Sequence, residues 1–245
     1  MSNVIGILPA RWASTRFPGK PLHRIAGRPL LWHAWQQTKK AKSLDAVIVA
    51  TDDQRIADAA REFGADVAMT SPKHPSGTDR IAEVAAQHAK ASILVNIQAD
   101  EPQMNPRIID RLVQALRRDR RCGMATAAAR LEEEDDRFRD PNVVKVVLDQ
   151  DQYALYFSRA PIPVRRDHST KRPAQPLQHL GIYAYRRRVL LEFVRWQPTP
   201  LERTEKLEQL RALHHGVKIK VLITKSVTHG VDTPEDARKI ERELL

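Results

Sequence analysis

The sequence predicts an α/β fold in which helices cover both faces of a mostly parallel sheet and a β portion is inserted. Over roughly the first 120 residues, apolar runs of strand length alternate four times with helical patterns. Such alternation is typical of a parallel, doubly wound sheet. Farther along, strands follow one another with short connections, which indicates an antiparallel excursion. A chain of 245 residues that is 42% hydrophobic can bury the core of one such domain.

The first half of the chain supplies four of the expected strands and four helices. The strands are the short apolar runs 4–8, 46–51, 66–69 and 93–97. Helices are expected over 30–41, over 56–63 before Gly64, from Asp79, and from Pro106 with Asn105 as the cap. Because parallel strands end at one edge of the sheet, we expect a ligand site at that edge.

The second half is expected to hold the inserted β portion and the last helices. Strands are expected over 124–129, 143–148, 153–157, 180–185 and 218–223, and helices over 189–196 and 200–215. Residues 161–176 contain four prolines and four Lys or Arg residues, which predicts an extended loop. Thr233 and Asp236 have the spacing of a capping box and open the final helix.

The loop after the first strand has the composition of a polyphosphate site. It carries three cations, Arg11, Arg16 and Lys20, and the small residues Ser14, Thr15 and Gly19. Backbone N–H groups and hydroxyls contact phosphate oxygens, and fixed cations neutralise them. The loop contains neither a Walker A motif nor Gly-x-Gly-x-x-Gly. The alternative is a solvated basic loop.

Two carboxylates at predicted strand ends are candidate metal ligands. Asp100 follows the strand 93–97, and Asp232 precedes the last helix. Carboxylates from distant segments beside a polyphosphate suit Mg²⁺, which prefers hard oxygen ligands. Each has a simpler alternative, because Asp232 could cap the last helix and Asp100 could be a turn residue. We interpret Asp52 and Asp53 as turn or cap residues.

Two further segments have a functional and a structural interpretation. Residues 76–80, Ser-Gly-Thr-Asp-Arg, could hold a base or ribose, although a helix cap is the simpler interpretation. In the expected helix 200–215, Glu205, Glu208 and Gln209 share one face. This face could read sugar hydroxyls, or it could be a solvated surface.

The charge and the single cysteine limit the possible functions. The net charge of +11 predicts attraction to polyanions such as nucleic acid, acidic membranes or nucleotides. The basic clusters 117–121 and 186–188 fall at expected helix ends, and we interpret them as solvated surface. Cys122, beside Gly123, is interpreted as a buried structural thiol in a reducing cytosol. No basic signal region and no long apolar run is present, so we expect a soluble, cytoplasmic protein.

Six longer motifs occur in order along essentially the whole chain. They are Leu8-Pro-Ala-Arg-x-Ala-Ser-Thr-Arg-Phe-Pro-Gly-Lys-Pro21, Gln98-x-Asp-Glu-Pro102, Tyr153-Ala-Leu-Tyr-Phe-Ser-Arg-Ala160, His179-Leu-Gly-Ile-Tyr-x-Tyr-Arg186, Leu207-Glu-Gln-Leu-Arg211 and Gly230-Val-Asp-Thr-Pro-Glu-Asp236. Together they closely resemble the 3-deoxy-manno-octulosonate (Kdo) cytidylyltransferases, the CMP-Kdo synthetase family.

This resemblance implies a Rossmann-like nucleotidyltransferase fold, an assembly that is usually a homodimer, and a catalytic activity. The family joins CTP and Kdo to give CMP-Kdo and pyrophosphate for lipopolysaccharide biosynthesis, with Mg²⁺ as the cofactor. The resemblance implies a single domain over 1–245. Residues 1–120 would then bind the nucleotide, and residues 121–245 would bind the sugar and form the dimer.

The resemblance also implies roles for individual residues. The nucleotide would be held by Leu8, Ala10, Arg11, Ser14, Arg16, Lys20, Ser76, Gly77, Arg80 and Gln98, and Mg²⁺ by Asp100 and Asp232. Catalysis would depend on Lys20, Arg11, Arg16 and the two aspartates. The acidic sugar would be surrounded by Gln98, Arg159, Arg166, His179, Tyr183, Tyr185, Glu208 and Gln209.

The chain departs from the family pattern in three places. Ala99 replaces the glycine of Gln-Gly-Asp-Glu-Pro, Val164 replaces a tryptophan, and the segment 227–230 before Asp232 is shorter than usual. Because alanine is strained at positive φ, we expect an ordinary negative φ at Ala99. These departures concern the sugar more than the reaction. The alternatives are a cytidylyltransferase for an amino-Kdo or a sialic acid, and a basic nucleic-acid-binding protein.

Overall fold

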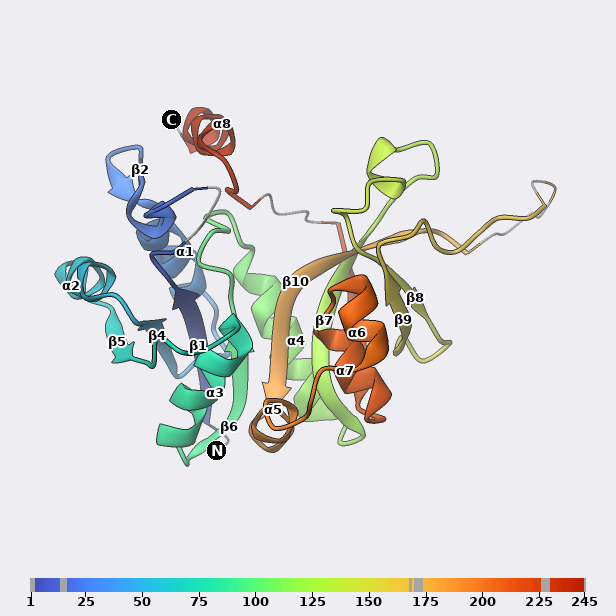
Figure 1. Cartoon of the computed structure of the whole chain (residues 1–245), viewed down its shortest axis with the longest axis horizontal. Coiled ribbons are helices and arrows are strands. Elements are labelled where there is room, and N and C mark those ends of the chain that lie inside the picture. Colours follow the sequence, from blue (N-terminus) through green and yellow to red (C-terminus); the bar gives the residue numbers. More distant parts are fainter. Residues whose placement is uncertain (1–2, 14–16, 168, 170–173, 226–229, 245) are drawn as a thin grey trace.

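The computed structural model describes residues 3–13, 17–167, 169, 174–225 and 230–244. Its centre is a mixed sheet whose main path runs β11-β7-β10-β6-β1-β4-β5 (Figure 1). Neighbours along this path are parallel, except that β10 runs antiparallel to both β6 and β7. The strands are β1 (Asn3–Ala10), β4 (Ala46–Thr51), β5 (Asp66–Met69), β6 (Ala91–Asn96), β7 (Cys122–Arg130), β10 (Leu177–Arg186) and β11 (Lys218–Thr224).

Helices cover both faces of this sheet, as the sequence predicts. Along β1, Val4 and Leu8 pack into one core with residues of α1, α2 and α4. Ile5 and Ile7 point to the opposite face and pack with α3, α5 and α7. The helices are α1 (Leu30–Lys39), α2 (Gln54–Glu62), α3 (Gly77–Gln87), α4 (Pro106–Arg118), α5 (Arg187–Phe193), α6 (Pro200–Glu205), α7 (Gln209–His214) and α8 (Pro234–Leu244).

The helices and strands of the first half of the chain form in the predicted order, and caps that the sequence encodes begin helices in both halves. Asn105 accepts the Arg107 N–H at the start of α4, and Asp53 caps α2. Thr233 and Asp236 exchange side-chain and backbone hydrogen bonds at the start of α8. A small hairpin, β2 (Arg24–Ile25) with β3 (Arg28–Pro29), was not expected, nor were the 3₁₀ turns η1 (Lys20–Leu22) and η2 (Asp136–Phe138).

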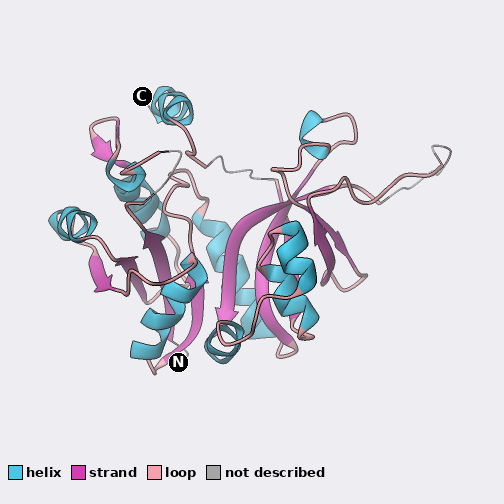
Figure 2. Cartoon of the chain, in the orientation of Figure 1, coloured by secondary structure: helices cyan, strands magenta, loops and turns pink. Residues whose placement is uncertain are grey.

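The inserted β portion is smaller than the sequence suggests. β8 (Lys145–Leu148) and β9 (Ala154–Ser158) form an antiparallel hairpin, and β8 meets the main sheet through the pair Lys145 and Gln178. β7, expected within the excursion, instead lies inside the main sheet. Its residues 122–129 are all buried, because small side chains let both faces be covered. The described residues between β9 and β10 contain no helix or strand and extend away from the body (Figure 2).

The prediction of a single helix over 200–215 is wrong, because the chain forms two helices there. Lys206 adopts the left-handed conformation, with φ 54° and ψ 47°, and ends α6. Thr199 and Glu202 form a capping box at the start of α6, and the same Glu202 carboxylate pairs with Arg211 of α7. This buried pair fixes the two short helices against each other. The apolar pattern of the sequence therefore runs through a sharp turn and not along one helix.

Two expectations from the sequence concern Cys122 and membrane-spanning segments. Cys122 is fully buried, donates its S–H to the Met124 carbonyl, and burial raises the pKa of its thiol to about 11. These facts fit a structural thiol and exclude a thiolate nucleophile near neutral pH. Among the described residues, no helix is both long and apolar enough to cross a membrane.

Candidate active site

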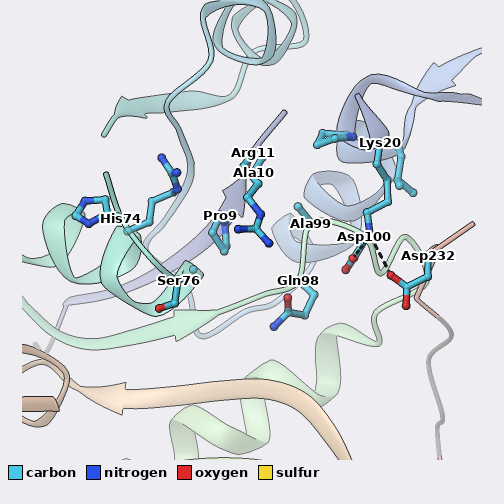
Figure 3. A pocket seen from close by; sticks show the side chains of 14 residues that line it. Pro9, Ala10, Arg11, Lys20, His74, Ser76, Gln98, Ala99, Asp100 and Asp232 are labelled. Atoms are coloured by element: carbon cyan, nitrogen blue, oxygen red, sulfur yellow. Dashed lines mark hydrogen bonds and ion pairs between the residues drawn. The ribbon is translucent and has the colours of Figure 1, made fainter. Parts of the chain in front are cut away.

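The carboxyl ends of β1 and β6 open onto a cavity of about 280 Å³, here called the Lys20 cavity (Figure 3). Residues 9–11 reach it from the end of β1, and residues 98–100 reach it from the segment after β6. The two strands are adjacent and parallel, so their ends meet at this edge of the sheet. The cavity therefore lies where the strand pattern predicts a ligand site.

Lys20 lies between two carboxylates from distant parts of the chain. Its Nζ donates to Asp100 Oδ2 at 2.5 Å and to Asp232 Oδ1 at 3.4 Å (Figure 3). The Val231 N–H donates to the Asp100 carbonyl at 2.9 Å, which joins the two segments. One cation thus contacts both carboxylates, which shows that Asp100 and Asp232 lie side by side at the Lys20 cavity.

Asp100 and Asp232 fit a hard divalent cation, because both direct carboxylate oxygens to a shared position. Within the ranges that the structure describes, no cluster of three or more His, Cys, Asp or Glu side chains could hold a metal ion. A cation here would therefore need oxygens from a ligand and from water. Mg²⁺ is commonly bound in this way, by one or two carboxylates together with substrate phosphates.

The start of α3 forms one wall of the Lys20 cavity. Ser76 and Gly77 line it, and Ser76 Oγ accepts the Asp79 N–H, so the capping role is confirmed. Arg80 also lines the cavity, but its side chain is only 5% exposed and pairs with Asp52 at 2.9 Å. A second hydrogen bond joins its guanidinium to Thr70. Arg80 is therefore held by the protein, with little of its charge free for a ligand.

The other residues expected at the nucleotide separate into three groups. Ala10 and Arg11 line the Lys20 cavity, and Arg11 is exposed. Leu8 does not line it, because its side chain is fully buried in the core beneath. Ser14 and Arg16 lie outside the described residues.

A second cavity of about 340 Å³, here called the Tyr183 cavity, adjoins the first. The two cavities share Pro9, Gly77 and Gln98 in their walls. Gln98 Nε2 donates to the Gly181 carbonyl at 2.8 Å and so connects the end of β6 to β10. Six residues expected at the sugar line this cavity together: Gln98, His179, Tyr183, Tyr185, Glu208 and Gln209.

An irregularity in β10 positions the aromatic residues of the Tyr183 cavity. The register with β7 shifts between Leu180 and Tyr183, and Thr126 Oγ1 donates to the Ile182 carbonyl at 2.7 Å. The same hydroxyl lies 3.0 Å from His179 Nε2. Burial lowers the pKa of His179 to about 3, so its imidazole is neutral near pH 7.

Among the described residues that line this cavity, the polar groups are neutral apart from Glu208 and Lys206. Burial raises the pKa of both tyrosine hydroxyls, Tyr183 and Tyr185, above the ordinary value. Glu208 Oε2 accepts the Thr78 hydroxyl at 2.8 Å. Hydroxyl, imidazole and amide groups around a concave surface can bind a polyhydroxylated ligand through many directional hydrogen bonds.

Two arginines expected at the sugar do not line the Tyr183 cavity. Arg159 donates to the carbonyls of Glu205 at 2.7 Å and Pro141 at 2.8 Å, which fixes its guanidinium to the protein. Arg166 is exposed on the segment between β9 and β10. Glu205 also differs from the expected shared face, because it accepts from Ser158 Oγ rather than facing the cavity with Glu208.

Comparisons with known proteins now connect this geometry to a family. A family model described as "Cytidylyltransferase" matches residues 5–219. A 3-deoxy-manno-octulosonate cytidylyltransferase of Syntrophobacter fumaroxidans is 52% identical over 97% of this chain and 95% of its own. The enzyme of the same name from Geobacter sulfurreducens is 47% identical over 99% of both chains. This chain belongs to the 3-deoxy-manno-octulosonate cytidylyltransferase family.

A solved structure of a family member supports the assignment. The structure of CMP:2-keto-3-deoxy-manno-octonic acid synthetase in complex with CTP matches with a TM-score of 0.93 and 38% identity, over 99% of this chain and 98% of that one. The fold alone is shared with a 4-diphosphocytidyl-2C-methyl-D-erythritol synthase from Anaerococcus prevotii, at 14% identity and a TM-score of 0.65. The predicted α/β nucleotidyltransferase fold is thus confirmed.

Some lining residues of this family member were missed from the sequence. They are His74, at the Lys20 cavity, and Asn96 and Lys206, at the Tyr183 cavity. Asn96 directly precedes Ile97, the predicted end of a strand, so its position could have indicated a residue of the site. Lys206 gave no signal, because its place at the cavity depends on the turn between α6 and α7, which the sequence analysis did not predict. The backbone at Ala99 does not have positive φ, which confirms that expectation.

Proposed function

We propose that this chain transfers the cytidylyl group of CTP to Kdo, giving CMP-Kdo and pyrophosphate. The observation that carries the proposal is the pair of adjoining cavities that share Pro9, Gly77 and Gln98. One offers cations and a carboxylate pair, and the other offers mainly neutral hydrogen-bonding groups. A triphosphate in the first and a sugar in the second would meet at the shared wall.

In this reaction the anomeric hydroxyl of the sugar attacks the α-phosphorus of CTP in line, and pyrophosphate leaves. The protein contributes by positioning the two substrates and by stabilising negative charge on the phosphate oxygens. Lys20 and Arg11 are the described cations that would hold these oxygens. No covalent intermediate with the protein is needed, which agrees with the buried, protonated Cys122.

We propose Mg²⁺ as the cofactor, held by Asp100 and Asp232. When bound, it would neutralise phosphate charge and make the sugar hydroxyl easier to deprotonate. Lys20 is the counter-ion of both carboxylates in the structure. Its ammonium group would turn to the triphosphate when the carboxylates are otherwise neutralised.

We further propose that the enzyme works in the cytoplasm, as a homodimer, and supplies lipopolysaccharide biosynthesis. Residues 1–120 would mainly bind the nucleotide, and residues 121–245 the sugar and the partner. The division is incomplete at the cavities, because Asp232 lines the first and Gln98 lines both.

A pyrophosphate-release assay with CTP, Mg²⁺ and a panel of 2-keto sugar acids tests the proposal. We expect turnover with Kdo and loss of turnover when Mg²⁺ is chelated. Preference for a sialic acid or an amino-Kdo would replace the sugar in the proposal. No turnover together with nucleic-acid binding that survives physiological salt would favour a nucleic-acid-binding protein, since dispersed cations alone give salt-sensitive binding.

A further inference from the structure

The Tyr183 cavity has an electrostatic problem if its ligand is an acidic sugar, as the proposed function requires. Glu208 supplies a carboxylate to its wall. An anionic ligand beside an uncompensated carboxylate would be repelled. The cavity therefore needs a cation in its wall to attract such a ligand.

The groups expected to supply that cation do not supply it in the structure. His179 is neutral near pH 7 because burial lowers its pKa to about 3. Arg159 donates to backbone carbonyls, and neither Arg159 nor Arg166 lines the cavity. Among the described residues that line it, Lys206 is the only lysine or arginine.

The backbone at Lys206 is a second, independent sign of function. Its φ of 54° and ψ of 47° lie in the left-handed region, where a glycine ordinarily ends a helix. A residue with a Cβ is disfavoured there. The conformation is fixed, because Lys206 N–H donates to the Glu202 carbonyl and its own carbonyl accepts from Arg159 at 3.4 Å. An unfavourable residue held in place beside a cavity suggests a role for its side chain.

We propose that Lys206 recognises the carboxylate of the acidic sugar and so helps to set the sugar specificity of this enzyme. Its position between α6 and α7 places it two residues before Glu208, within the same wall. Lys206 and Glu208 both line the cavity, so its wall carries one basic and one acidic residue before the sugar enters. This inference rests on the proposed function and names the group that distinguishes acidic from neutral sugars.

Steady-state kinetics of Lys206→Gly and Lys206→Met test the proposal. Glycine accepts the left-handed backbone without strain, so Lys206→Gly removes the charge and keeps the fold. Because the side chain is exposed, we expect the KM for Kdo to rise by roughly three- to tenfold. The KM for CTP should stay within twofold, and Lys206→Arg should restore most of the Kdo affinity. Arg203→Met is the matched control, since Arg203 is an exposed cation of α6 that lines neither cavity.

A neutral analogue identifies the group that Lys206 contacts. The carboxamide of Kdo, tested as an inhibitor, should bind wild type and Lys206→Gly with equal affinity, so the preference for the acid shrinks in the variant. An unchanged KM for Kdo in both variants, or equal weakening of acid and carboxamide, overturns the inference while wild-type turnover leaves the proposed function intact. A folded wild type that forms no CMP-Kdo would overturn the proposed function and this inference with it.

Discussion

Replacing Lys20 by alanine tests the centre of the proposed site, and the structure makes the expected result more specific. The Lys20 side chain is 14% exposed and contacts two carboxylates that are 31% and 51% exposed. Its loss would therefore remove an ion pair and leave Asp100 and Asp232 facing each other. A partly exposed pair of this kind contributes about 1 kcal/mol to stability. For a chain of 245 residues, we expect the melting temperature without metal to fall by about 2–4 °C.

The effect of Lys20→Ala on turnover should be much larger than the effect on stability. A charged contact made to phosphate oxygens in the transition state is typically worth about 10²–10³ in kcat. Mg²⁺ alone should raise the melting temperature of Lys20→Ala more than that of wild type, because the two carboxylates have lost their counter-ion. Lys40→Ala is the control, since Lys40 is an exposed lysine bonded to Gln37.

Pyrophosphate release at saturating CTP and Kdo, together with thermal melting with and without Mg²⁺, measures both effects. A folded Lys20→Ala with kcat within threefold of wild type would remove Lys20 from the reaction. An equal Mg²⁺ response in the variant and in wild type would show that Lys20 does not compete with the metal for the carboxylates.

Three further predictions follow from the same geometry. Asp100→Asn and Asp232→Asn should each abolish Mg²⁺-dependent turnover, and full turnover of a variant at limiting Mg²⁺ would exclude that residue as a metal ligand. Without metal, Asp100→Asn should have a slightly lower melting temperature, because Lys20 loses its closer partner. Because burial lowers the folded-state pKa of His179 to about 3, wild type should lose stability as pH falls below about 6.5, by at most about 1.4 kcal/mol per pH unit. In urea titrations, His179→Gln should show a smaller loss of stability between pH 6.5 and 5. Ala99→Gly should keep CTP and Kdo chemistry, cost about 0.5–1 kcal/mol of stability and change sugar affinity modestly, whereas lost turnover would show that the loop depends on the alanine.

Local signals predicted the first half of the fold because each element there carries its own pattern. The strand 46–51 and the helix from Pro106 form as expected, since apolar periodicity and caps lie within the element. The position of β7 could not be predicted in the same way. It lies beside β10 and β11, which come later in the chain, and no local pattern specifies a partner so far away.

The site could be predicted where function constrains residue type and not where tertiary contacts decide. Asp100 and Asp232 were identified as a pair, and the structure brings both to Lys20. The break at Lys206 was missed because the apolar pattern of a helix continues through it, while the buried Glu202–Arg211 pair that bends the chain is a tertiary contact. One positive φ angle, at Lys206, thus replaces the expected single helix by two short helices and places this lysine in the wall of a cavity.

The large positive charge is the feature of the sequence that depends most on structure for its meaning. Arg186 donates to the Cys122 carbonyl at 2.8 Å and to the Leu116 carbonyl near the end of α4. Lys145 is fully buried, and its Nζ donates to the carbonyls of Asp140, Val143 and Arg159. These cations use their hydrogen bonds on backbone carbonyls of the protein itself. Part of the net charge is therefore committed to the fold, so a cation at a cavity, such as Lys20 or Lys206, carries more information about the ligand than the total of +11.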